Sequence, residues 1–383
     1  MTSQERAHIA GLLDIDEFTI PRGGNVIMRE RAVALPAASI QVLMILSIAR
    51  WTVVLQHSPP PSIDFSSPIE ELRQLVSAME KTAYDSCPRF DTQETVIDIT
   101  MRDGYQSNLH ITKPGNSTGA NPVVVLIFGG AFVMGTNIQS IIWARTIAAL
   151  YGATVVQPSY RLAPEHKFPT APNDIWDSVQ WIAANESALD ADLTKGFVIG
   201  GGSAGGNLSI VTAHRSVKEK LSPPITGVLA SIPVCMSQET VPEKYKHLWV
   251  SRGQNGNAPG NPGLDSKSIG GYEALYQQDF LSEDFSPFCS IVPFSAIPRT
   301  YVQVAGLDIL RDDGIVYAKV LEDNGVEVKL DAYPGMPHGH FNLWPHLKQS
   351  IKSQEDTVWH FGWLLGCQVP REKVEEIVAM TRI

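Results

Sequence analysis

The chain has 383 residues, of which 44% are hydrophobic and 18% charged, so it can build a large core and is too poor in charge for a disordered chain. Lys and Arg number 30 against 40 Asp and Glu, a formal net charge of −10, which argues against a general electrostatic grip on nucleic acid or an anionic membrane. The four cysteines are far apart and form no C-x-x-C motif. We therefore expect neither a disulfide scaffold nor a structural zinc site.

The N-terminal segment MTSQERAHIAGLLDIDEF carries charges early and lacks the apolar centre of a secretory signal, so we expect a cytoplasmic protein. Residues 35–55 form the most apolar early stretch, but Pro36, Gln41 and Arg50 interrupt it. A membrane span needs about 20 nearly uncharged residues. This stretch is therefore predicted to be a packing helix, and contact with a membrane is not expected.

Residues 1–85 are predicted to be mostly helical, with a break at the proline-rich stretch 59–68. Residues 94–112 alternate apolar and polar side chains around Asp103-Gly104, which predicts a β-hairpin. From residue 122 on, short apolar runs predict strands at 123–128, 153–156, 197–199, 227–232, 301–304 and 326–330. Helical patterns separate them near 137–149, 171–185, 205–218, 311–324 and 351–366. This alternation predicts an α/β fold with a mostly parallel central sheet flanked by helices.

The interval 236–290 breaks this rhythm with a Gly- and Asn-rich stretch and then aromatic helical material around Tyr272 and Tyr276. A long insertion in a regular α/β pattern is usually functional. We expect residues 1–85 and this insertion to form a helical cap over the carboxyl edge of the sheet, and residues 86–383 to form the catalytic domain.

The motif G-x-S-x-G occurs twice, at residues 115–119 and 201–205. The first copy lies between two strand-like runs, so Ser117 is predicted to be a turn residue. The second directly follows the strand FVIG and opens a helix, which is the context of a nucleophile elbow. Ser203 is therefore the candidate nucleophile, and the helix N-terminus would stabilise negative charge beside it.

A serine hydroxyl needs a base, and in hydrolases on such a sheet the acid and then the histidine follow the nucleophile in the chain. His338 and His340 lie in the loop after the last predicted strand. We favour His338, because Gly335, Pro337 and Gly339 bracket it in a tight turn. His340 is expected to pack at the rim of this loop.

Asp308 directly follows the strand YVQVAG and is the favoured acid, since a carboxylate must orient the imidazole and stabilise its charged form. Asp312 and Asp313, the alternative acids, are predicted to be carboxylates at a helix N-terminus. The glycine-rich loop 129–135 follows the strand 123–128, and its N–H groups, together with that of Ala204, could form an oxyanion hole. The alternative for this loop is a plain βα turn that needs glycine.

Together these segments resemble the hormone-sensitive-lipase-like branch of the α/β-hydrolases, in the motifs FGGA at 128–131, YRLAPEHKFP at 160–169, GGSAGG at 201–206, DILRDDG at 308–314 and HGH at 338–340. The resemblance covers about residues 90–365. It implies an α/β-hydrolase fold, a structural role for 160–169, and no metal or organic cofactor. It assigns the site roles to the nucleophile Ser203, the acid Asp308, the base His338 and the oxyanion donors Gly130, Ala131 and Ala204.

Three positions depart from the pattern of this branch. Phe128 stands where a histidine is usual, which removes a polar anchor of the oxyanion loop, and Ala131 stands at the third glycine, where it is expected to be crowded. Gly202 stands where an aspartate commonly precedes the nucleophile. All three lie around the acyl site and leave the three triad residues unchanged.

The leading hypothesis is a serine hydrolase of the carboxylesterase type that cleaves an ester or related acyl bond of a hydrophobic small molecule through an acyl-enzyme. A second hypothesis, favoured by Phe128 and Gly202, is a biosynthetic cyclase or lyase that uses the same pocket. A third is a ligand-binding protein on this scaffold, which the presence of His338 disfavours because receptors resembling this branch have lost that base. The apolar and charged pattern of residues 369–383 permits a homodimer.

Overall fold

The structure is a computed structural model that describes residues 68–117, 119–256 and 264–382. Most of the predicted N-terminal cap segment, including the helix expected at 35–55, lies outside these residues, as does part of the Gly- and Asn-rich stretch of the insertion. Within the described ranges, no helix has both the length and the apolar character needed to cross a bilayer.

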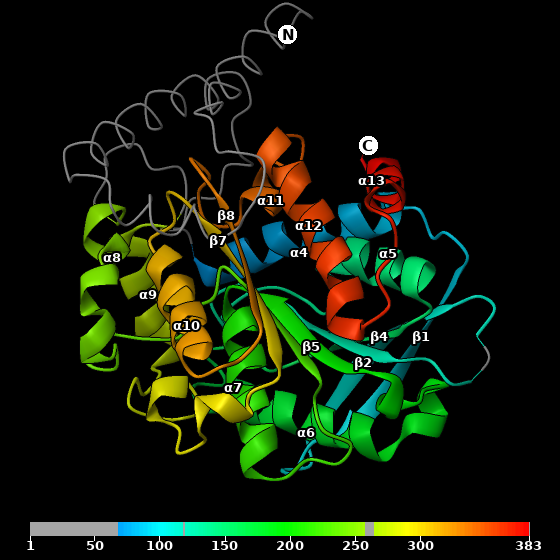
Figure 1. The fold of residues 1–383 in the computed structure, drawn as a ribbon, viewed down its shortest axis with the longest axis horizontal. Helices are drawn as coiled ribbons and strands as arrows, with labels where there is room; N and C mark the ends of the chain where they lie inside the picture. The colour runs from blue at the N-terminus through cyan, green and yellow to red at the C-terminus, as the bar shows by residue number, and fades with distance from the viewer. Residues whose placement is uncertain (1–67, 118, 257–263, 383) are drawn as a thin grey trace, which may run out of the picture.

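The centre of the molecule is an eight-stranded sheet with the order β1-β2-β4-β3-β5-β6-β7-β8 (Figure 1). Its strands are β1 (Thr92–Thr100), β2 (Gln106–Pro114), β3 (Val123–Ile127), β4 (Thr154–Pro158), β5 (Phe197–Gly202), β6 (Gly227–Ser231), β7 (Arg299–Ala305) and β8 (Val328–Tyr333). The pairs β1–β2 and β2–β4 are antiparallel, and every other pair is parallel. The predicted hairpin and the mostly parallel sheet are both confirmed.

Helices separate the parallel strands, as the sequence pattern predicts. Over the described residues they are α4 (Ile69–Ser86), α5 (Ile141–Tyr151), α6 (Thr170–Ala184), α7 (Ala204–Lys218), α8 (Ser251–Gln254), α9 (Ser266–Tyr276), α10 (Arg311–Asp323), α11 (His340–Leu343), α12 (Lys348–Leu365) and α13 (Arg371–Met380). The five predicted flanking helices are confirmed as α5, α6, α7, α10 and α12, with ends that differ by a few residues.

The central strands are buried on both faces because helices cover each one. Along β3, Val123, Val125 and Ile127 belong to the core cluster that includes α6 and α7, whereas Val124 and Leu126 belong to the cluster of α5 and α12. Successive side chains of a strand point to opposite faces, so a strand covered on both faces must be apolar throughout. All five residues of β3 are at most 1% exposed. Each such side chain contributes about 1.5–3 kcal/mol on burial.

The interval 236–290 departs from this alternation, as predicted, and contains the 3₁₀ helix Glu243–Leu248 as well as α8 and α9. Two buried carboxylates in the first turn of α10 hold this interval against the core. Asp312 Oδ2 accepts hydrogen bonds from the backbone N–H groups of Val250 and Ser251. Asp313 accepts from the indole N–H of Trp249 at 2.9 Å and from the Arg252 guanidinium at 3.0 Å. The two aspartates do begin a helix, as expected, but their carboxylates also bind the insertion.

Candidate active site

Ser203 lies in the sharp turn between β5 and α7, with φ 56° and ψ −117°. A Cβ on Gly201 would lie 2.3 Å from the carbonyl oxygen of Ile127, and one on Gly205 would lie 2.1 Å from the same atom. Both positions therefore require glycine so that the turn can pack against β3. A non-glycine residue at this positive φ costs of order 1–3 kcal/mol, which the surrounding packing must hold. The geometry is that of the predicted nucleophile elbow.

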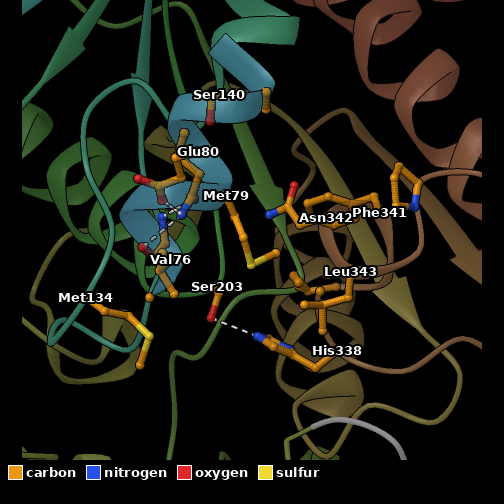
Figure 2. Close-up of a pocket in the computed structure, with 18 of the residues that line it drawn as sticks. Val76, Met79, Glu80, Met134, Ser140, Ser203, His338, Phe341, Asn342 and Leu343 are labelled. Atoms are coloured by element: carbon orange, nitrogen blue, oxygen red, sulfur yellow. Dashed lines mark hydrogen bonds between the residues drawn. The ribbon is translucent and has the colours of Figure 1, made fainter. Parts of the chain in front are cut away.

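The three predicted polar residues meet beside this turn. His338 Nε2 lies 2.9 Å from Ser203 Oγ, and His338 Nδ1 lies 2.7 Å from Asp308 Oδ2. Because Nδ1 faces a carboxylate, it carries the proton and leaves Nε2 free to accept the Ser203 hydroxyl proton. Figure 2 shows the Ser203–His338 contact among the residues that line the larger pocket.

The Asp308 side chain is fully buried. Contacts from the loop after β7, from the loop after β8 and from the insertion set its position. Its Oδ1 accepts the N–H of Leu310 at 2.8 Å, and its backbone carbonyl accepts Asn255 Nδ2 at 2.8 Å. With one oxygen held by this N–H and the other by His338, the carboxylate cannot turn away from the imidazole. Asn255 belongs to the insertion, which therefore supports the acid directly.

His340 does not pack at the rim of the loop, and this prediction is wrong. The residue is only 1% exposed and begins the short helix α11. Its Nδ1 lies 3.0 Å from Ser350 Oγ, whose hydroxyl in turn donates to the His340 carbonyl. Burial lowers the pKa of His340 to about 3, so the ring stays neutral at ordinary pH. The αL glycine between the two histidines turns one toward Ser203 and the other into the core.

The loop after β3 holds a strained backbone beside the elbow. Ala131 and Phe132 have φ of 54° and 62°, and Gly130 has φ of 123°. Ala131 thus stands in a conformation that glycine adopts more easily. Among the described residues, the N–H groups of Gly130, Ala131 and Ala204 donate to no backbone or side-chain acceptor. They therefore remain the predicted donors of an oxyanion hole.

An aromatic stack replaces the polar anchor that a histidine at position 128 would supply. The Phe128 ring stacks on Tyr160 with 4.0 Å between centroids, and the Tyr160 hydroxyl donates to the Phe128 carbonyl at 3.1 Å. Phe132 stacks in the same way on Tyr276 of α9, at 4.1 Å. Stacked pairs contribute about 0.5–1.5 kcal/mol beyond their buried area. The loop is therefore held by one aromatic contact before its strained residues and by a second at Phe132, which is one of them.

Helix α4 braces the same loop from outside the sheet. Glu80 Oε1 accepts Gln139 Nε2 at 2.8 Å, and Gln139 Oε1 accepts the N–H of Gly129 at 2.8 Å. Glu80 Oε2 also accepts the hydroxyl of Thr136 at 2.6 Å. Burial raises the pKa of the Glu80 carboxyl above its usual value, although both partners oppose this shift.

The sequence analysis missed Glu80. The available signal was a carboxylate inside the apolar stripe of a helix, since Val76, Met79 and Ala83 on the same face line the pocket. A buried charged residue on such a face usually has a specific partner, and here that partner is the oxyanion loop.

Among the described residues, two cavities have Ser203 in their lining. The larger measures about 310 Å³ and lies between α4, α5, the elbow and the segment after His338 (Figure 2). A smaller one of about 50 Å³ lies between the elbow and α9. A Cβ on Gly202 would meet only the Phe341 ring, at 3.7 Å, so the space that an aspartate would use there is left to the larger cavity.

The comparisons with known proteins agree with the fold. A family model described as the alpha/beta hydrolase fold matches residues 124–342. An AB hydrolase superfamily protein of Schizosaccharomyces pombe is 32% identical over 279 residues, which is 72% of this chain and 81% of that protein. Versiconal hemiacetal acetate esterase of Dothistroma septosporum is 29% identical and covers 78% of this chain and 89% of its own length. Among solved structures, vibralactone cyclase matches with a TM-score of 0.74 and 28% identity, covering 82% of this chain and 94% of its own.

The fold and the comparisons define an enzyme of the carboxylic ester hydrolase type. The chain belongs to the α/β-hydrolase fold family, in the hormone-sensitive-lipase-like branch that the sequence motifs indicated.

Proposed function

We propose that the protein is a serine carboxylesterase in which Ser203, His338 and Asp308 form the catalytic triad. The observation that carries this proposal is the unbroken chain of two short contacts, Ser203 to His338 and His338 to Asp308, at the end of a large apolar cavity. Nucleophile, base and orienting acid within hydrogen-bond reach are what serine-based acyl transfer requires.

In the first half of the reaction, Ser203 Oγ forms a bond to the ester carbonyl carbon and its proton passes to His338 Nε2. The carbonyl oxygen becomes an oxyanion, which the N–H groups of Gly130, Ala131 and Ala204 stabilise. The bond to the alcohol oxygen then breaks, and this oxygen takes the proton from His338. The products of this half are the free alcohol and an acyl group on Ser203.

In the second half, His338 takes a proton from a water molecule, which attacks the acyl carbon. The bond to Ser203 Oγ breaks, Oγ regains the proton, and the carboxylic acid leaves. Asp308 keeps its charge throughout and stabilises the imidazolium that forms twice in the cycle. Every step uses side chains, backbone N–H groups and water.

The substrate that best suits this site is a hydrophobic small molecule. The larger cavity is lined by apolar side chains such as Val76, Met79, Trp143, Phe341 and Leu343. Helix α4 and the insertion each contribute to the walls, which supports the proposal that the N-terminal segment and the insertion act together as a cap. Apolar walls with few polar groups favour an ester with little charge.

The test is hydrolysis of p-nitrophenyl acetate, butyrate and octanoate, combined with labelling by a fluorophosphonate. We expect turnover and labelling, both abolished in Ser203→Ala and both retained in Ser117→Ala, the serine of the other G-x-S-x-G motif. Turnover that survives in Ser203→Ala would overturn the proposal.

A biosynthetic cyclase or lyase is the second candidate, favoured by the match to vibralactone cyclase over most of both chains and by the replacements Phe128 and Gly202. In such an enzyme the same nucleophile would act without net hydrolysis of an ester. Labelling at Ser203 with no turnover of any simple ester would favour it. The third hypothesis, a ligand-binding protein, would be favoured if the fluorophosphonate failed to label Ser203.

A further inference from the structure

The two cavities beside Ser203 differ about sixfold in volume, 310 Å³ against 50 Å³. Four residues line both of them, namely Ala131, Ser203, Leu264 and Tyr272. The cavities therefore meet at the nucleophile. An ester whose carbonyl carbon lies at Ser203 Oγ has two arms, the acyl chain and the alcohol, and it has one cavity for each.

The position of His338 decides which arm enters which cavity. The base must return its proton to the leaving alcohol oxygen, which has to lie within hydrogen-bond reach of Nε2. His338 and the residues that follow it, Gly339, Phe341, Asn342 and Leu343, line the larger cavity, and none of them lines the smaller one. The alcohol arm is thereby directed into the larger cavity, and the acyl chain is left with the smaller one.

The volumes limit what each arm can be. An apolar cavity of about 150 Å³ holds one benzene ring of six carbons. On that scale the smaller cavity holds about two non-hydrogen atoms beyond the carbonyl, and the larger one about twelve. These sizes correspond to an acetyl or propionyl group on one side and a fused-ring or similarly bulky alcohol on the other.

Aromatic rings in mutual contact form one side of the smaller cavity. Phe132 and Tyr276 are parallel with 4.1 Å between centroids, and Phe285 packs against Phe132 at 6.4 Å. The three side chains are 4%, 2% and 1% exposed. A longer acyl chain that extends toward these rings would have to displace one of them from a close-packed cluster, which costs free energy.

We propose that the substrates of this site are short-chain esters, acetyl or propionyl, of bulky apolar alcohols. This inference rests on the proposed esterase function. It adds which cavity takes the acyl chain of the substrate and which takes the alcohol. The selectivity comes from the partition of space around Ser203, with α9 and the aromatic rings limiting the acyl side and α4 and α5 enclosing the alcohol side.

A pair of isomeric esters tests the direction. In 2-(2-naphthyl)ethyl acetate the naphthyl group is on the alcohol side of the ester. Its isomer methyl 3-(2-naphthyl)propanoate has the ester group reversed, so the naphthyl group is on the acyl side. Both are alkyl esters of equal composition, so leaving-group ability and hydrophobicity differ little. We expect kcat/KM for the acetate to exceed that for the propanoate by about tenfold or more, the discrimination that a filled apolar pocket gives against extra carbons.

A matched pair of cavity variants tests the acyl side separately. Ile269→Ala enlarges the smaller cavity, and Ile142→Ala enlarges the larger cavity by the same three carbons. We expect Ile269→Ala to raise the ratio of butyrate to acetate turnover of the naphthylethyl esters by about fivefold or more, within the range that one or two methylenes command in an apolar pocket. Ile142→Ala should leave this ratio unchanged. Melting temperatures of both variants confirm that they are folded.

Equal rates on the two isomers, or a preference for the propanoate, would overturn the inference. So would a protein that hydrolyses p-nitrophenyl acetate but neither isomer, and in that case the proposed esterase function would stand. A protein that hydrolyses none of these esters would overturn the proposed function together with the inference.

Discussion

The two halves of the candidate site are held in different ways. On the triad side, Asp308 and His338 meet through side-chain contacts within loops that directly follow β7 and β8. On the oxyanion side, the useful groups are backbone amides, and their position depends on side chains from elsewhere in the chain. Glu80 of α4 reaches the loop through Gln139, at a sequence separation of 59 residues.

The two halves should therefore respond differently to substitution. A triad residue acts by its own chemistry, so replacing it removes a function outright. The oxyanion loop carries two non-glycine residues with positive φ, Ala131 and Phe132, and such a conformation persists only where the surroundings hold it. Replacing a bracing residue should therefore shift the amides and weaken transition-state stabilisation without abolishing the reaction.

The largest expected effect is on the triad side. Ser203→Ala and His338→Ala should each lower kcat by about 10⁶-fold, and the double variant should lower it no further, because the two residues act as a unit. Single-turnover kinetics on a p-nitrophenyl ester measure this. Losses that add up in the double variant would show that the two side chains act independently.

Asp308→Asn should lower kcat by about 10⁴-fold with little change in the melting temperature, since the amide holds the imidazole in the wrong tautomer. The matched control is Asp177→Asn on α6. It removes a carboxylate that pairs with Arg102 and should leave kcat unchanged. A loss of less than tenfold in Asp308→Asn would exclude Asp308 as the orienting acid.

On the oxyanion side, Glu80→Ala should lower kcat by about 10- to 100-fold with KM nearly unchanged, less than the 10²–10³-fold loss of a whole oxyanion donor. Glu80→Gln keeps an oxygen that can accept from Gln139, so it should recover most of the rate. The control is Glu71→Ala, an exposed position on the same helix. If Glu80→Ala changed only the melting temperature and left kcat at the wild-type value, α4 would have a purely structural role.

The smallest expected effect concerns His340, the neighbouring histidine that is buried in the core and does not contact Ser203. Its pKa is about 3 in the folded protein and about 6.5 when unfolded, so the unfolded chain binds the extra proton first as the pH falls. Stability from this group is complete above about pH 6.5 and is lost on acidification toward pH 3, by about 2 kcal/mol at pH 5. Denaturant unfolding at pH 7.5 and 5.0 should show that His340→Asn loses about 2 kcal/mol less than the wild type on this change. An equal loss in both proteins would contradict the assignment.

Local patterns in the sequence were sufficient to predict the sheet and the strand–turn–helix segment around Ser203. They also singled out the three candidate triad residues, which the structure brings into contact. Apolar runs alternating with helical stretches predicted the parallel strands, because a strand buried on both faces must be apolar throughout. The motif around Ser203 could be separated from the one around Ser117 by its strand–turn–helix context alone. Asp308 was favoured because it directly follows a strand, and His338 because glycines and a proline bracket it in the loop after the last strand. The carboxyl ends of parallel strands meet at one edge of a sheet.

The tertiary structure decided what depends on contacts between distant segments. The burial of His340 against Ser350 and the stacking of Phe128 on Tyr160 are such contacts, and so is the brace from Glu80. The sizes of the two cavities depend on how α4, α5 and α9 pack around Ser203, which no local pattern encodes. The chemistry of this site could be predicted because each residue type stands in a recognisable local pattern near the end of a strand. Its shape follows from side chains that meet only after the chain has folded.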